Sequence, residues 1–249
     1  MYRFFVEPQQ IHLDDKRVII TGSDVNHIKN VLRMREGEEL AVSNGSDGRE
    51  YRCAILETQE DCVVCELRFI KEDAVELPVK VTLFQGLPKA DKMEWIIQKA
   101  VELGVYRIVP VATRRCVVKL DAKKEKSKLV RWQGIAEAAA KQSKRGIVPE
   151  IGEVLSFAQA VEQAKKMGVG LIPYELAEGM AKTRQRIERI VPGDEIAIFI
   201  GPEGGFEESE IAQATEAGIE PITLGRRILR TETAGMTVLA WIMYHLEGE

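Results

Sequence analysis

The sequence predicts an α/β protein in which a small β-rich region precedes a larger domain of alternating strands and helices. Up to about Asp73, short strands follow one another closely with glycine-rich turns between them, as in a small barrel. Residues 71–78 are charged and end in proline, which is typical of a linker. Beyond Pro78, strands and helices alternate, which favours a mostly parallel sheet covered on both faces. We therefore expect domains over residues 1–73 and 78–249.

In the first domain, apolar runs predict strands, and a short polar segment predicts a helix. The strands are expected at 17–21, 39–43, 50–57 and 62–70, and the helix at 24–33. Cys62 and Cys65 form a CxxC pair within the last of these strands. Residues three apart in a strand point to opposite faces, and no second Cys or His pair is present to complete four ligands. We expect buried structural thiols and no metal.

In the second domain, strands are expected at 79–84, 108–112, 168–173, 195–200 and 221–224. Helices are expected from Asp91 to Gly104, with Glu94 completing a capping box, and at about 126–143, 156–167, 207–217 and 233–246. In such sheets a ligand binds outside the carboxyl ends of the strands. The loops after Ile172, Ile200 and Leu224 are therefore the candidate site.

The composition limits the location and the partners. No apolar stretch is long enough to cross a bilayer, and the first residues lack the regions of a signal peptide, so we expect a cytoplasmic protein with no membrane contact. The net charge is -4, yet residues 114–145 hold eleven Lys or Arg against three acids, a local charge of +8. Such a segment is either a surface for nucleic-acid phosphates or a solvated helix face, and the charge alone does not decide.

The first candidate loop lies within 198–206, which reads IFIGPEGGF. Its glycines allow backbone amides to approach a ligand closely. The segment has neither a GxxxxGK[ST] nor a GxGxxG pattern, and Glu203 would repel a phosphate. A carboxylate suits a ligand with hydroxyls, an amino group or a positive centre. The alternative is a tight turn in which Glu203 caps the following helix.

The second candidate loop lies within 224–234, which reads LGRRILRTETA. It places three arginines beside two large apolar residues, a combination that a purely structural loop rarely needs. A pocket for a flat ring, walled by leucine and rimmed by cations, would use it. Thr231 or Thr233 can cap the last helix.

Together, GPEGGF and LGRRILRTETA resemble the RsmE family of bacterial 16S rRNA (uracil-N3-)methyltransferases, in the SPOUT superfamily. The resemblance covers nearly the whole chain and includes 27–33 with Gly37, Gln85-Gly86, Lys89, Lys92, 97–99, 102–104, 113–115, 137–143 and Arg145. The family often has serine where this chain has Arg115, so the resemblance assigns no role to Arg115.

The resemblance implies a PUA-like barrel for RNA at the N-terminus and a SPOUT methyltransferase domain with a C-terminal trefoil knot. It implies a homodimer that uses S-adenosylmethionine to methylate N3 of one uridine in the decoding-centre helix of 16S rRNA, in the small ribosomal subunit. This cofactor carries its own electrophile, so no metal is required. The cofactor-binding residues expected in the three loops are Pro173, Tyr174, Ile200, Gly201, Pro202, Glu203, Gly204, Gly205, Leu224, Gly225, Ile228, Leu229 and Thr233.

Uridine N3 bears a proton at neutral pH, and removing that proton puts negative charge on the uracil oxygens. We expect Arg230 to stabilise this charge, with Glu232 positioning Arg230 or assisting proton removal. The alternative for Arg230 is a salt bridge that only fixes the loop. RNA contacts are expected from Lys89, Lys92, Arg114, Arg145 and Arg33.

Two other functions remain open at this point. One is a non-catalytic rRNA-binding assembly factor, for which the barrel and the basic segment alone would suffice. The other is a SPOUT methyltransferase that acts on another RNA or on a ribose 2′-hydroxyl.

Overall fold

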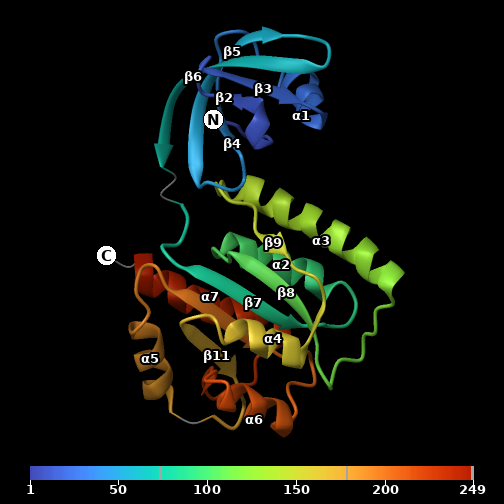
Figure 1. Ribbon diagram of the computed structural model, residues 1–249, viewed down its shortest axis with the longest axis vertical. Coiled ribbons are helices and arrows are strands. Elements are labelled where there is room, and N and C mark those ends of the chain that lie inside the picture. The colour runs from blue at the N-terminus through green and yellow to red at the C-terminus, as the bar shows by residue number, and fades with distance from the viewer. Residues whose placement is uncertain (73–74, 178, 248–249) are drawn as a thin grey trace. The chain divides into compact units, whose positions relative to one another are not determined.

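The computed structural model describes residues 1–72, 75–177 and 179–247, which form two compact units (Figure 1). The first comprises Met1–Glu76 and Ala140–Val148, and the second comprises Leu77–Ala139 and the chain from Pro149 onward. The sequence reasoning assigned residues 140–148 to the second domain only. The first unit is therefore discontinuous in sequence, a feature that local patterns do not reveal.

The first unit contains a six-stranded sheet with the order β1-β4-β5-β6-β3-β2. β1 and β4 run parallel, and the other neighbours run antiparallel. Apolar side chains from alternate strand positions pack together into a buried core. The elements are β1 (Arg3–Phe5), η1 (Pro8–Gln10), β2 (Ile11–His12), β3 (Arg17–Thr21), α1 (Ser23–Asn26), η2 (His27–Val31), β4 (Glu39–Ser43), β5 (Arg49–Thr58) and β6 (Cys62–Glu72).

The predicted helix over 24–33 is shorter than expected, because a four-residue α-helix passes directly into a π-helical turn that ends at Val31. The CxxC pair lies in β6. Cys65 is buried, and burial raises the pKa of its thiol to about 12, while Cys62 is half-buried. No group of three or more His, Cys, Asp or Glu able to hold a metal occurs within the described ranges.

Residues 140–148 return to the first unit through polar contacts. Arg145 is only 2% exposed, and its guanidinium binds the carboxylate of Glu76 through Nε and Nη2, at 3.1 and 2.5 Å from Oε2. The backbone amides of Gly146 and Ile147 donate to the other oxygen of Glu76. The expectation that Arg145 contacts RNA is therefore wrong, because its guanidinium is enclosed by its own unit.

The second unit contains a parallel sheet with the order β10-β8-β7-β12-β11-β13, with β9 beside β8. The strands are β7 (Lys80–Gly86), β8 (Arg107–Ala112), β9 (Glu150–Ile151), β10 (Leu155–Ser156), β11 (Val169–Pro173), β12 (Glu195–Ile200) and β13 (Glu220–Ile222). The alternation of strands and helices that the sequence predicted is confirmed.

Helices cover both faces of this sheet (Figure 1). Leu83 and Phe84 are neighbours in β7 and so point to opposite faces. Phe84 joins a core with α4 and α6, whereas Leu83 lies against Gly235 of α7, which also packs on α2. The helices are α2 (Lys92–Glu102), α3 (Ala122–Gln142), α4 (Phe157–Ala164), α5 (Met180–Glu188), α6 (Glu208–Glu216) and α7 (Thr231–Glu247).

Three details differ from the prediction. Helix α5 was not predicted, and α3 begins four residues earlier than expected. The predicted capping box at the start of α2 is wrong: the Asp91 side chain makes no cap bond, and the Glu94 carboxylate pairs with Arg131, with 2.7 Å between Oε1 and Nε. None of the described helices combines the length and the apolar character needed to cross a membrane. The trefoil knot stays a prediction.

Candidate functional site

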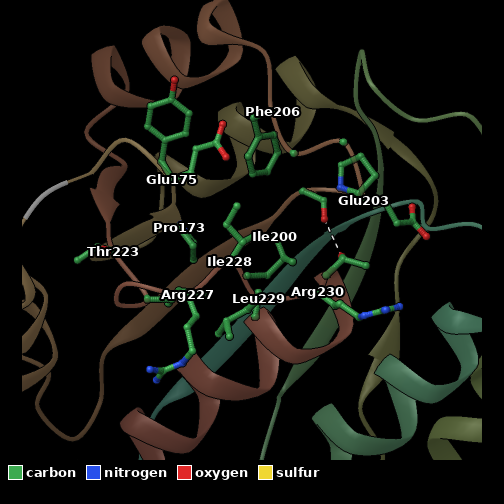
Figure 2. Close-up of a pocket in the computed structure, with 18 of the residues that line it drawn as sticks. Pro173, Glu175, Ile200, Glu203, Phe206, Thr223, Arg227, Ile228, Leu229 and Arg230 are labelled. Carbon is green, nitrogen blue, oxygen red and sulfur yellow. Dashed lines mark hydrogen bonds between the residues drawn. The ribbon is translucent and has the colours of Figure 1, made fainter.

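A cavity of about 520 Å³ lies at the carboxyl ends of β11, β12 and β13 (Figure 2). Its walls come from residues 173–175, 200–206 and 223–231. These are the three loops expected to form the site because they follow the carboxyl ends of parallel strands. Every residue expected to bind the cofactor lines this cavity except Thr233. That residue is exposed in the first turn of α7, where its carbonyl accepts a bond from Thr237. The volume is typical of a site for a small molecule.

The glycine loop folds tightly on itself. The amide of Gly205 donates to the carbonyl of Pro202 at 2.9 Å, and Gly205 has a φ of +67°. A Cβ on Gly201 would lie 3.0 Å from the backbone of Gly205, so neither position accepts a larger residue easily. The following helix is capped by Glu207 in a capping box with Glu210. The alternative that Glu203 caps this helix is therefore wrong.

Glu203 instead connects the glycine loop to the start of α2. One of its oxygens accepts from the Lys92 ammonium at 2.8 Å and from the amide of Lys89 at 3.1 Å. Burial acts to raise the pKa of Glu203, but the bond from Lys92, bonds from backbone amides and the Lys92 charge outweigh it and hold that pKa below its ordinary value. Glu203 is therefore ionised at neutral pH.

The loop after β8 fixes the glycine loop from another side. The guanidinium of Arg115 donates to the carbonyl of Gly204 and to Glu207, both at 2.9 Å. Its bond to Glu207 is the main reason that the pKa of that carboxyl is lowered. Arg114 donates through its amide to Glu210 and through its side chain to Ser209, each at 3.0 Å. Arg114, expected to bind RNA, thus also anchors α6.

The opposite wall, residues 224–230, has a different character. Ile228 is 88% exposed although it lines the cavity, and Arg230 is exposed at the mouth. Figure 2 shows Arg227 and Arg230 extending to opposite sides of Leu229. Glu232, expected to position Arg230, has its carboxylate 3.8 Å from the Lys92 ammonium instead. Lys92 thus lies between two carboxylates at the edge of the cavity.

The cavity and the sheet around it have counterparts in known proteins. The RNA methyltransferase domain family matches residues 75–243, and the RNA methyltransferase PUA domain family matches residues 20–67. The fold and site therefore define an RNA methyltransferase that carries a PUA domain.

Individual relatives narrow this class. Ribosomal RNA small subunit methyltransferase E of Bacillus subtilis (strain 168) is 39% identical, over 99% of this chain and 98% of its own length. The enzyme of the same name from Mesomycoplasma hyopneumoniae (strain 232) is 36% identical, over 96% and 97%. A crystal structure of the Neisseria gonorrhoeae enzyme of that name, bound to S-adenosyl methionine, is 32% identical with a TM-score of 0.81 and covers 98% of this chain and 97% of its own. The chain belongs to the ribosomal RNA small subunit methyltransferase E family.

Sequence reasoning missed several residues of this site. It assigned Lys92 to RNA and left out Thr231, Phe206 and Arg115, all of which line the cavity. It also gave no role to Gln85, which is fully buried at the end of β7. A signal for Gln85 was present, because a polar residue at the end of an apolar strand must find a partner.

Proposed function

We propose that this protein methylates N3 of a uridine in the decoding-centre helix of 16S rRNA, with S-adenosylmethionine as the methyl donor. The observation that carries the proposal is the cavity at the ends of β11, β12 and β13. One of its walls is a glycine loop and the other presents Arg230 at the mouth. Relatives that are named for methylation of small-subunit rRNA match along nearly the whole chain, which supports the substrate class.

The residues of the cavity fit this cofactor. The close approach of Gly201 to Gly205 leaves backbone groups facing the cavity, and Ile200 and Leu229 offer apolar walls to a flat ring. Glu175 and Glu203 place carboxylates in a lining that also holds Lys92 and four arginines, and such a mixed lining suits a ligand that carries both amino and carboxylate groups. When bound, S-adenosylmethionine supplies an electrophilic methyl group, so the protein's task is to orient the acceptor and exclude water.

Residues at the mouth of the cavity would prepare the uracil. The base must be unpaired or flipped to expose N3, and its proton must leave before or during transfer. The Arg230 guanidinium would stabilise the negative charge that develops on the uracil oxygens. Glu232, whose carboxylate lies 3.8 Å from the Lys92 ammonium, would receive the proton.

Contacts with RNA would extend beyond the cavity. Lys89 and Arg114 are exposed in the second unit, and Arg33 is exposed in the first. Their phosphate contacts would make binding sensitive to salt. We also propose a homodimer, for which the part-exposed apolar residues of α7, such as Trp241 and Met243, are compatible with an interface. A ribosomal substrate would be encountered in the cytoplasm.

The test uses small ribosomal subunits from cells that lack this gene. Purified protein and S-adenosylmethionine should restore 3-methyluridine, measured by mass spectrometry of nucleosides and mapped by digestion of the rRNA. Methylation of a ribose 2′-hydroxyl or of another RNA would contradict the N3 assignment. Cofactor binding with no methyl transfer to any rRNA would favour an assembly factor.

A further inference from the structure

Behind the cavity, three separate segments meet at one buried hydrogen-bonded relay. Gln85 is the penultimate residue of β7, Gly201 begins the glycine loop, and Thr231 begins α7. The Gln85 Nε2 donates to the Thr231 Oγ1 at 2.9 Å, and that hydroxyl donates to the Gly201 carbonyl at 2.6 Å. Gln85 is 0% exposed and Thr231 is 6% exposed, so water does not compete for these bonds.

The relay can run in only one direction. The Gly201 carbonyl can only accept, so the single hydroxyl hydrogen of Thr231 is committed to it. Thr231 can therefore only accept from residue 85, which must provide an N–H group. The second N–H of Gln85 donates to the carbonyl of Gly86 at 3.0 Å, which fixes the orientation of the amide. A carboxylate at position 85 would compete for the Thr231 hydrogen and release Gly201.

The side-chain amide of Gln85 carries a cost in folding stability. Gln85 Oε1 is buried and has no hydrogen-bond partner among the described residues. A buried polar atom without a partner destabilises the folded state, so an apolar residue of similar size would suit β7 better on stability alone. The relay is therefore better explained by what it holds in place than by its contribution to folding.

Gly201 and Thr231 line the cavity on two different walls, while Gln85 lies behind them. Gly201 starts the loop expected to hold the cofactor, and Thr231 lies between Arg230 and Glu232, which are expected to handle the uracil. Resting on the function proposed above, we propose that Gln85 and Thr231 are positioning residues. Their relay sets the distance between the cofactor loop and the residues that prepare the acceptor base.

The strand end and the loop are also in direct contact. A Cβ on Gly86 would lie 2.6 Å from Cδ and 2.7 Å from N of Pro202. Gly86 thus brings the backbone of β7 against the glycine loop, directly beside the relay. The loop packs directly on β7 at Gly86 and is linked to Gln85 through the hydroxyl of Thr231, so the two connections hold the start of the loop in place.

The decisive comparison is between two substitutions of Thr231. Thr231→Ser keeps the hydroxyl, whereas Thr231→Val keeps the shape and removes the relay partner of the Gly201 carbonyl and of one N–H of Gln85. Gln85→Glu is a second route to the same loss and decides the question if Thr231→Val does not fold. Thr237→Val is the control, because it removes one hydroxyl-to-carbonyl bond from the same helix outside the cavity. The readouts are the Kd for S-adenosylmethionine by calorimetry, hydrogen exchange of the amides of Gly201 and residues 203–205, and the unfolding temperature.

Thr231→Val and Gln85→Glu should weaken cofactor binding on the order of tenfold and speed hydrogen exchange at the amides of Gly201 and residues 203–205. Thr231→Ser and Thr237→Val should remain within about twofold of wild type in Kd. The double variant, Gln85→Glu with Thr231→Val, should bind S-adenosylmethionine no more weakly than the worse of the two single variants, because both substitutions break the same relay.

If Thr231→Val and Gln85→Glu lower only the unfolding temperature and bind cofactor like wild type, the relay is merely structural and the inference is wrong. Failure of the wild-type protein itself to bind S-adenosylmethionine would contradict the proposed function instead. The two outcomes are therefore distinguishable in a single series of titrations.

Discussion

The two main walls of the cavity are held in place very differently. The glycine loop, residues 201–205, is fixed by side chains from three other segments: Lys92, Arg115 and Thr231. For residues 226–229 of the opposite wall, the described part of the chain shows no side-chain hydrogen bond or ion pair, and Ile228 is 88% exposed. Gly225 is held locally by Thr223, and the carbonyl of Arg230 by the first turn of α7.

This difference separates two tasks within one cavity. A wall with many anchors keeps its shape before a ligand arrives, so less ordering is required on binding. A wall with few anchors can adjust to a ligand at little cost in stability. Substitutions in the anchored wall should therefore affect both stability and cofactor binding, whereas those in the free wall should affect binding or turnover alone.

The largest effect is expected from Gly86→Ala, which attacks the anchored wall. Its new Cβ would lie 2.6 Å from Cδ of Pro202, so the glycine loop must move. Cofactor binding should fall by at least about 100-fold in calorimetry, with a lower unfolding temperature. Gly134→Ala is the control: its Cβ meets nothing within 4 Å in α3, so it should stabilise by roughly 0.5–1 kcal/mol. Equal affinity of the two variants for S-adenosylmethionine would contradict the close contact between Gly86 and Pro202.

Arg230→Ala should have an effect of similar size, but on turnover alone. Loss of the guanidinium should lower kcat by about 10²–10³ with nearly unchanged cofactor Kd, because this side chain is expected to act on the uracil. The unfolding temperature should not move, since Arg230 is exposed. Arg230→Lys keeps the charge but loses the planar fork and should recover only part of the rate. A large rise in cofactor Kd would instead assign Arg230 to cofactor binding.

Glu203→Gln should have a moderate effect that depends on pH. The folded-state pKa of Glu203 lies below its ordinary value, so its pair with Lys92 stabilises above that ordinary value, 4.5, and is lost as pH falls through the lowered pKa. At pH 7 the substitution should destabilise by about 1 kcal/mol or less. Thermal unfolding from pH 7 to pH 3 should show wild type and variant converging at the acid end. A difference in unfolding temperature that stays the same from pH 7 to pH 3 would mean that the ion pair of Glu203 and Lys92 does not contribute to stability.

The smallest effect is expected from Ile228→Ala in the free wall. Because this side chain is 88% exposed, its truncation should change stability by less than about 0.5 kcal/mol in chemical denaturation. If Ile228 packs on the bound cofactor, the Kd should still rise several-fold. A clear loss of stability would show that residues 226–229 are better anchored than the contacts suggest.

The sequence predicted the alternating sheet, and the walls of the cavity follow from a rule about parallel strands. Gly201 and Ile200 were found because glycines after an apolar strand are a local pattern. Lys92, Arg115 and Gln85 were not placed at the cavity, since each reaches it from a distant segment and local patterns carry no such information. The predicted RNA contact of Arg145 was wrong for the same reason, because its partner, Glu76, lies 69 positions away in the sequence. The sequence of a basic segment does not show which of its residues is buried.

The buried pair of Arg145 and Glu76 also bears on the order in which the protein is made. Residues 140–148 belong to the first unit, so that unit cannot be completed until they have left the ribosome. By then β7, α2, β8 and all of α3 have been synthesised. During that interval the carboxylate of Glu76 lacks the guanidinium of Arg145. The first unit therefore stays incomplete until a segment encoded more than sixty codons downstream has been synthesised.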